Sequence, residues 1–192
     1  RVATQKGGHD TGRPVLVEKP LAPNGREADR IVAEAARTGT SLMVAQTLRF
    51  DPLIRAVREE AKTIGPLRVV ALSQRFEPTS RGWIDTPGRG GTILNTGIHA
   101  FDLLRFLTGA EIVSVRAEAL RVVTQRTEDE FAAIVRLEPG QILATVDNAR
   151  TTEGRSGRIE IAGAKAQIRA DYVHRELHRI DDLLGAGAAA EI

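Results

Sequence analysis

The spacing of the apolar residues changes along the chain, and this change constrains the fold more than any other feature of the sequence. Before residue 67, apolar residues come in short runs or at helical spacing. After residue 110 they alternate with polar residues, as in the segments 113–119 and 131–138. Alternation with period two is typical of strands that bury one face only. The sequence therefore predicts two different architectures in succession.

The first architecture is a β-α-β unit. Residues 15–17 and 41–45 are short apolar runs, which we expect to form strands buried on both faces. Residues 24–38 between them follow a helical period, with Asn24 suited to the N-cap and Gly39 to the position after the last turn. A strand, a helix and a strand in this order indicate a piece of parallel sheet.

The second architecture is an antiparallel sheet with one covered face. A helix from Asp51 to Ile64 leads into it and acts as a bridge between the two parts. Turn residues at 139–140 and at 163–165 predict two hairpins. The predicted strands are 67–76, 113–119, 131–138, 141–148, 158–162 and 166–170, and a final helix is expected at 172–184.

The stretch Gly90–Asp102 is the candidate site. Its two glycines permit a tight turn that leaves backbone N–H groups open to a ligand. In the helix that follows, Leu94, Ile98, Phe101 and Leu104 should form the buried stripe, and Gly109 should end the helix. Asn95, His99 and Asp102 share another face. Histidine can move a proton near neutral pH, so this face suits a polar substrate; the alternative is a structural histidine.

Composition excludes several classes of function. The net charge is only +2, with no basic block and few aromatic residues, which argues against nucleic-acid binding. The chain has no cysteine, so disulfides and thiolate chemistry are excluded, and we expect no metal site. No apolar run of about 18 residues and no signal peptide are present, so we expect no membrane segment and a cytoplasmic protein.

Three motifs occur in a fixed order: Glu18-Lys19-Pro20 after the first apolar run, Arg49-Phe50-Asp51-Pro52 before the bridging helix, and the stretch Gly90–Asp102. Together they resemble the Gfo/Idh/MocA family, the glucose–fructose oxidoreductase and inositol dehydrogenase group, over residues 14–170. The resemblance implies an α/β protein in which an incomplete Rossmann-type parallel sheet precedes a largely antiparallel open sheet with a helix packed on one face. It also implies hydride transfer between NAD or NADP and a hydroxyl carbon of a sugar, polyol or related substrate.

The resemblance assigns two catalytic residues. Lys19 would lie near the nicotinamide and the reacting hydroxyl, where its charge favours an alkoxide-like transition state. His99 would take or return the hydroxyl proton. Glu18, Lys19 and Pro20 would together contact the cofactor. Asp102 would support His99 or act as a structural cap.

The resemblance also assigns substrate-binding residues. Asn95 stands where the family often has aspartate, so it can hold a hydroxyl but cannot take a proton. Trp83 lies in the region of the family's substrate loops, with a loop anchor as the alternative. Arg49 would bind substrate, with an ion pair as the alternative. Lys165 sits in the segment Gly163-Ala164-Lys165-Ala166, where we expect a purely structural turn.

The sequence lacks the G-x-G-x-x-G turn of a complete dinucleotide-binding unit, and seventeen residues precede Glu18. We therefore expect residues 1–50 to be the C-terminal remnant of a dinucleotide-binding domain. Residues 51–192 would form a substrate-binding and dimerisation domain that is incomplete at its C-terminus. Three origins would explain such a chain: a fragment of a longer protein, the ordered part of a longer chain, or a natural truncation. The sequence does not distinguish them.

Three functions stay in competition. The first is an NAD(P)-dependent oxidoreductase, and the second is a non-catalytic substrate-binding or dimerisation module that has lost the dinucleotide site. The third is an unrelated α+β interaction domain. A homo-oligomer formed through the open sheet face is expected, because an uncovered face would otherwise leave a large apolar patch.

Overall fold

The computed structural model describes residues 13–79, 81–181 and 190–191. The polar, glycine-containing segment 1–14 predicts an irregular lead-in, and its residues 1–12 lie outside the described range. The chain divides into two compact units, Arg1–Thr47 and Leu48–Ile192.

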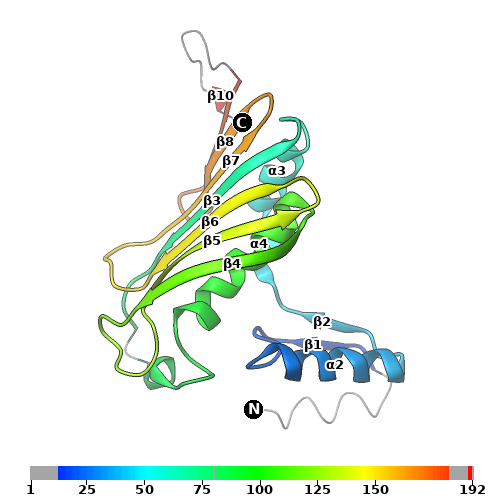
Figure 1. The fold of residues 1–192 in the computed structure, drawn as a ribbon, viewed down its shortest axis with the longest axis vertical. Helices are drawn as coiled ribbons and strands as arrows, with labels where there is room; N and C mark the ends of the chain where they lie inside the picture. The colour runs from blue at the N-terminus through cyan, green and yellow to red at the C-terminus, as the bar shows by residue number, and fades with distance from the viewer. Residues whose placement is uncertain (1–12, 80, 182–189, 192) are drawn as a thin grey trace. The chain divides into compact units, whose positions relative to one another are not determined.

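The first unit contains the predicted β-α-β arrangement. Strands β1 (Val15–Val17) and β2 (Leu42–Val44) pair in parallel, and α2 (Gly25–Thr38) connects them (Figure 1). The Asn24 side chain accepts a hydrogen bond from the Glu27 N–H at 3.0 Å and so begins the helix. Gly39, with φ of 65°, ends it in the left-handed conformation.

One expectation for this unit is wrong. The two strands were expected to be buried on both faces, yet the side chains of Leu16 and Met43 are 68% and 46% exposed. These two residues are register partners, so they lie on the same face of the sheet. Among the described residues, the single helix α2 can cover only one face of a two-stranded sheet, which explains the exposure.

The second unit is built on an eight-stranded sheet with the order β10-β9-β8-β7-β3-β6-β5-β4. All neighbours pair antiparallel except β3 and β6, which are parallel. The strands are β3 (Leu67–Arg75), β4 (Glu111–Leu120), β5 (Glu130–Glu138), β6 (Ile142–Ala149), β7 (Ser156–Gly163), β8 (Gln167–Asp171), β9 (Glu176–Ile180) and β10 (Ala190–Glu191). The predicted largely antiparallel open sheet is therefore confirmed.

Both predicted hairpins are present. β5 and β6 pair antiparallel across the turn at 139–140, and β7 and β8 pair antiparallel across 164–166. In the second turn, the N–H of Lys165 donates to the Ile64 carbonyl at 2.9 Å, and the N–H of Ala164 donates to the Pro66 carbonyl at 3.0 Å. These bonds tie the turn to the residues just before β3, as a structural turn would. The predicted helix from Asp51 to Ile64 is shorter in the structure and ends at Ala61.

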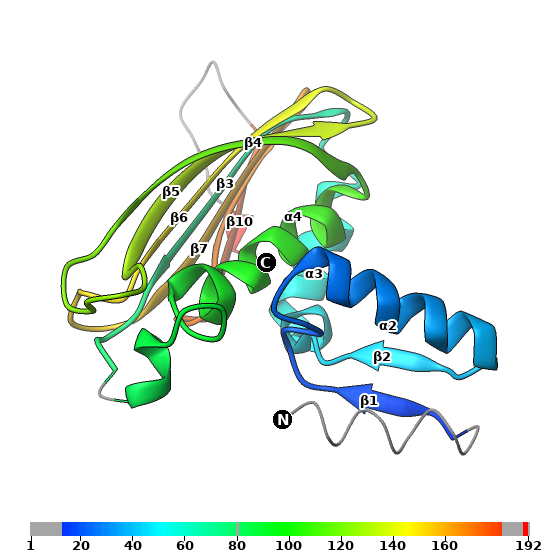
Figure 2. The same ribbon diagram turned by 60° about the horizontal axis from the view of Figure 1, so that its bottom comes forward.

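Two helices cover one face of this sheet (Figure 2). They are α3 (Pro52–Ala61) and α4 (Ile98–Thr108). Their inward residues Ile54, Val57, Leu103 and Leu104 belong to one core together with the inward residues of β3, β5, β6, β7 and β8. The core therefore lies between the sheet and the two helices, and the other face of the sheet is open.

Two further predictions need correction. The buried stripe of α4 is Ala100, Leu103, Leu104 and Leu107, whereas Leu94, Ile98 and Phe101 are only half-buried. A π-helical turn, η3 (Ile93–Gly97), precedes α4, and its wider turn shifts the phase of the helix. The final helix predicted at 172–184 is instead a turn followed by β9, and residues 182–184 lie outside the described range.

Candidate active site

The stretch Gly90–Asp102 runs from a turn through η3 into α4, as one continuous helical segment. Asn95 lies in η3 and His99 in the first turn of α4, and both side chains are half-buried. π-helical turns are often found at functional sites, because they displace a side chain relative to a regular helix. The amide and the imidazole are thus presented about one helical turn apart on the same segment.

The glycine turn does not leave its N–H groups open to a ligand, which corrects the sequence-based expectation. The N–H of Gly90 donates to the Thr86 carbonyl at 2.7 Å, and the N–H of Gly91 donates to the Ile84 carbonyl at 2.8 Å. A Cβ atom on Gly90 would lie 1.9 Å from the Ile84 carbonyl oxygen. The turn therefore needs glycine because neighbouring backbone packs against it, and it is not a cradle for an anion.

Glu128 fixes the residues that follow this turn. Its carbonyl accepts from the Thr92 N–H and its Oε1 accepts from the Ile93 N–H, both at 2.9 Å. The Thr92 hydroxyl donates to the Asp129 carbonyl at 2.8 Å. The start of the helical segment that carries Asn95 and His99 is therefore held by the connection between β4 and β5.

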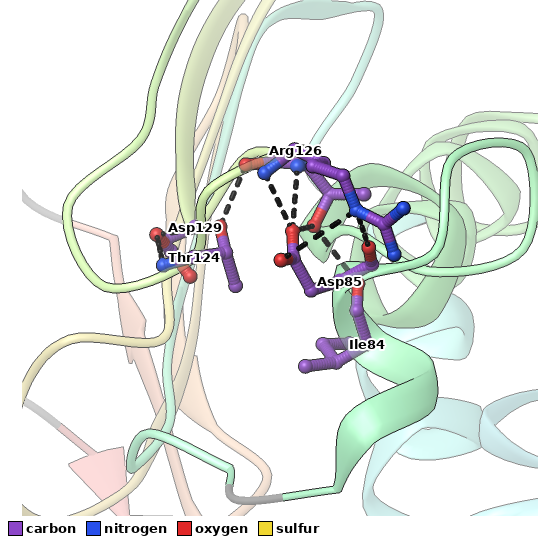
Figure 3. Close-up of polar contacts among 6 residues, drawn as sticks. Ile84, Asp85, Thr124, Arg126 and Asp129 are labelled. Carbon is purple, nitrogen blue, oxygen red and sulfur yellow. Dashed lines mark hydrogen bonds and ion pairs between the residues drawn. The ribbon is translucent and has the colours of Figure 1, made fainter.

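The same connection holds the loop that carries Trp83. This loop contains the 3-10 helix η2 (Gly82–Asp85), and Trp83 is 44% exposed. Asp85 Oδ1 accepts from the N–H groups of Arg126 at 2.6 Å and Thr127 at 3.0 Å (Figure 3). The Thr127 hydroxyl donates to the Ile84 carbonyl at 2.8 Å. These backbone hydrogen bonds lower the pKa of the Asp85 carboxyl.

Asp129 organises the connection itself. Its Oδ2 accepts from the N–H groups of Val122 and Val123, both at 2.8 Å, and from that of Thr124 at 2.9 Å. Burial opposes ionisation of this carboxyl, but the hydrogen bonds from Thr124, Val122 and Val123 outweigh it and lower the pKa of Asp129. A single buried carboxylate thus shapes the loop that supports both predicted site segments.

Arg49 and Asp102 form an ion pair, which is the alternative that the sequence left open for Arg49. Nε and Nη2 of Arg49 donate to the two carboxylate oxygens of Asp102 at 2.8 and 2.6 Å. The hydrogen bond to Asp102 raises the pKa of Arg49. The guanidinium also stacks over the Phe106 ring, 5.4 Å from its centroid. Asp102 therefore ties α4 to the 3-10 helix η1 (Thr47–Phe50).

A buried polar set beneath η3 was not predicted. With its amide oxygen toward the helix, Asn148 accepts from the Gly97 N–H at 3.1 Å, and its nitrogen donates to Gln74 Oε1 at 3.2 Å. Gln74 Nε2 donates to the Tyr172 hydroxyl at 2.7 Å. Burial raises the pKa of Tyr172 to about 12. A signal was present in the sequence, because Gln74 and Asn148 occupy inward positions of alternating strands.

The remaining predicted residues lie in the first unit. Glu18, Lys19 and Pro20 follow the carboxyl end of β1, where open α/β sheets bind ligands. Glu18 is exposed, Lys19 and Pro20 are half-buried, and the Lys19–Pro20 peptide bond is cis. Lys19 thus belongs to one unit and His99 to the other.

No group of three or more His, Cys, Asp or Glu side chains in the described part of the chain could hold a metal ion. No helix among the residues that the structure covers is long and apolar enough to cross a membrane.

Comparison with known families fits this architecture. Residues 55–169 match the GFO/IDH/MocA C-terminal domain, and the chain belongs to the Gfo/Idh/MocA oxidoreductase family. It is 31% identical to myo-inositol 2-dehydrogenase of Thermotoga maritima over 83% of this chain and 49% of that protein. It is 30% identical to trans-1,2-dihydrobenzene-1,2-diol dehydrogenase of Sus scrofa over 82% of this chain and 48% of that protein. The chain thus spans about half the length of these relatives.

Solved structures agree in fold. A probable dehydrogenase from Thermotoga maritima superposes with a TM-score of 0.79 at 28% identity, covering 88% of this chain and 53% of that one. A levoglucosan dehydrogenase in complex with NADH and L-sorbose superposes with a TM-score of 0.89, covering all of this chain and 57% of that one. Its identity is 20%, so this second likeness concerns the fold alone.

Proposed function

We propose that this chain is the substrate-binding and catalytic portion of an oxidoreductase that transfers a hydride between NAD or NADP and a hydroxyl carbon of a sugar, polyol or related compound. The observation that carries the proposal is the placement of Asn95 and His99 on one rigidly held helical segment, in a chain of this family. The relatives named above include a polyol dehydrogenase and a dihydrodiol dehydrogenase, which supports a small hydroxylated substrate.

His99 is proposed as the general acid and base. It would accept the hydroxyl proton when the substrate is oxidised and return it when the substrate is reduced. Asn95 would hydrogen-bond a neighbouring hydroxyl and so orient the substrate. Its amide can donate and accept hydrogen bonds, but it carries no charge and cannot take a proton. Trp83 would provide an apolar surface for the substrate from its anchored loop. Arg49 is proposed to act on the substrate indirectly, through its hold on Asp102 and α4.

The described residues fit the cofactor only in part. Glu18, Lys19 and Pro20 end a parallel strand, which suits contacts to the nicotinamide end, and the charge of Lys19 would stabilise negative charge on the reacting oxygen. No glycine-rich turn from a strand to a helix occurs in the described β-α-β unit, and Asn24 already caps α2. The described residues therefore provide no binding site for the pyrophosphate. When bound, the nicotinamide supplies or accepts the hydride.

A second candidate function is a non-catalytic substrate-binding or dimerisation module. The open sheet face supports its dimerisation part. On that face Val69, Ile134 and Leu143 lie on adjacent strands and are 46%, 56% and 50% exposed. We propose that a second copy of the chain covers this face. Both candidates share this assembly.

Titration of the 192-residue chain with NADH and NADPH, followed by nicotinamide fluorescence, separates the two functions. Saturable binding supports the oxidoreductase. Its absence at millimolar cofactor supports the module for this chain, and the oxidoreductase assignment then belongs only to a longer protein that contains it. In the oxidoreductase, His99→Gln should lower kcat by about 10²- to 10⁴-fold with myo-inositol or another active polyol. His178→Gln, on β9, is the matched control. Equal activity of the two variants would exclude His99 as the acid and base.

A further inference from the structure

A small hollow lies at the edge of the sheet where β3 and β6 end. These two strands are parallel, so the segments that follow them, 76–79 and 150–152, meet at the same edge. The hollow is lined by residues from both segments, by Ile84 and by the connection between β4 and β5; they include Thr79, Thr124, Asp129 and Arg150. Figure 3 shows Ile84 on one side of this region and Thr124 and Asp129 on the other.

Arg150 is the charged donor of this hollow. Its guanidinium packs over the Phe76 ring, 5.8 Å from the centroid, and its Nε atom is buried. Within residues 13–79 and 81–181 this Nε atom has no hydrogen-bond acceptor, and the nearby Glu77 carboxylate pairs with Arg155 instead. A buried donor without an acceptor destabilises the folded protein, and more so when it is charged, so the site favours a ligand that supplies an acceptor.

The acidic groups around Arg150 are committed elsewhere. Glu77 Oε2 accepts from Arg155 Nε at 2.8 Å. Asp129 Oδ2 already accepts from the N–H groups of Val122, Val123 and Thr124 and from the Thr124 hydroxyl. Burial, followed by the positive charge of Arg155, lowers the pKa of Arg150, and the carboxylates of Glu77 and Asp129 oppose this shift. The carboxylates near Arg150 are therefore engaged with other donors, and neither forms an ion pair with its guanidinium.

From this geometry we propose that Arg150 anchors a binding site for a small anion of carboxylate or phosphate chemistry. The planar guanidinium offers parallel N–H donors that match two oxygens of either group. The Phe76 ring supports the flat face of the guanidinium, and the β4–β5 connection closes one side of the hollow. The proposal does not depend on the dehydrogenase assignment, because it uses neither Lys19 nor His99.

The test is a titration of the whole chain with sodium phosphate and, separately, sodium acetate, at ionic strength kept constant with sodium chloride. The readout is the Nε–H resonance of Arg150 in a ¹H–¹⁵N spectrum, assigned by its loss in Arg150→Lys. We expect a saturable shift with at least one anion, and the stronger binder identifies the class. A response that does not saturate, or that chloride reproduces, overturns the proposal.

Two charge-removing variants test whether the anion binds at Arg150 itself. Arg150→Gln should weaken anion affinity at least about tenfold, as reported by the amide resonances of Val123 and Thr124. Arg158→Gln removes the same charge from an exposed position of β7 and should leave affinity unchanged. Equal weakening by both variants would show a general charge effect and overturn the site. If Arg150→Gln does not fold, the wild-type titration and Arg150→Lys decide, because Lys keeps the charge but lacks the paired donors.

Discussion

The two faces of the eight-stranded sheet are made by the same strands but depend on different partners. On β5, Val135 and Leu137 are completely buried under the helices, whereas Ile134, the residue before Val135, is 56% exposed. The covered face also contains the paired amides of Gln74 and Asn148 beneath the candidate site. The fold and the geometry of the candidate site therefore depend on the face that α3 and α4 cover. The exposed apolar residues of the open face do not contribute to this core, so their presence needs another explanation.

The sharpest test of this comparison is a matched pair of truncations on one strand. Leu137→Ala should lower the free energy of unfolding by about 2–5 kcal/mol, because it opens a cavity in a fully packed core. Ile134→Ala on the open face should change it by about 0.5 kcal/mol or less in the monomer. Urea unfolding at low protein concentration measures both. Similar losses for the two variants would contradict the division into faces.

A smaller effect is expected where α4 approaches the sheet. A Cβ atom on Gly97 would lie 2.8 Å from two ring atoms of Phe131, so Gly97→Ala should cost about 1–3 kcal/mol. Gly82→Ala, whose new methyl group meets nothing within 4 Å, is the control. Adding Phe131→Leu to Gly97→Ala should recover part of the loss, and no recovery would mean that the ring is not the obstacle. Calorimetric unfolding provides the measurement.

The buried polar set makes a prediction about pH. Tyr172 has a pKa of about 12 in the folded chain against about 10 when unfolded, so the unfolded state loses its proton first as pH rises. Stability should therefore be unaffected below pH 10 and fall between pH 10 and 12, by roughly 2 kcal/mol. Tyr172→Phe should abolish this component.

Tyr172 is the only tyrosine of the chain, so phenolate absorbance reports its titration directly. A midpoint near 10 in the folded protein would show that the hydroxyl is solvated and that the covered face is open at this point.

The smallest effect on folding is expected on the open face, where the effect on assembly should be large. Leu143→Lys should change the free energy of monomer unfolding by about 0.5 kcal/mol or less, since this side chain is 50% exposed. It should dissociate the proposed homo-oligomer, because a charge would be buried against a second copy. Val122→Lys, at an exposed loop residue, is the control. Sedimentation that shows the same assembly for both variants would rule out this face.

Much of the fold follows from local signals in the sequence. Asn24 and Gly39 bound α2, and Pro139-Gly140 marks a hairpin, because cap and turn preferences act over a few residues. Prediction from the sequence failed where contacts between distant segments determine the local structure. The offset between Leu94 and the buried stripe of α4 depends on a π-helical turn, and residues 176–180, within the predicted helix 172–184, form a strand because they pair with β8.

The candidate site shows the same limit. The positions of Asn95 and His99 on one helical segment were predicted from their spacing. Two partnerships could not be predicted, because they join residues far apart in the chain: Arg49 with Asp102, and the Gly90-Gly91 turn with the residues around Ile84 and Glu128. The roles of Lys19 and His99 in catalysis stay predictions.

The bond between Asp85 and the backbone at Arg126 and Thr127 has a consequence for protein engineering. It joins the loop that carries Trp83 to a segment about forty positions further along the chain. Replacing only one of the two loops with that of a relative would leave either the Asp85 carboxylate without its donors or the two N–H groups without their acceptor. Loop exchange aimed at changing substrate choice should therefore move residues 77–91 and 121–129 together, as one cassette.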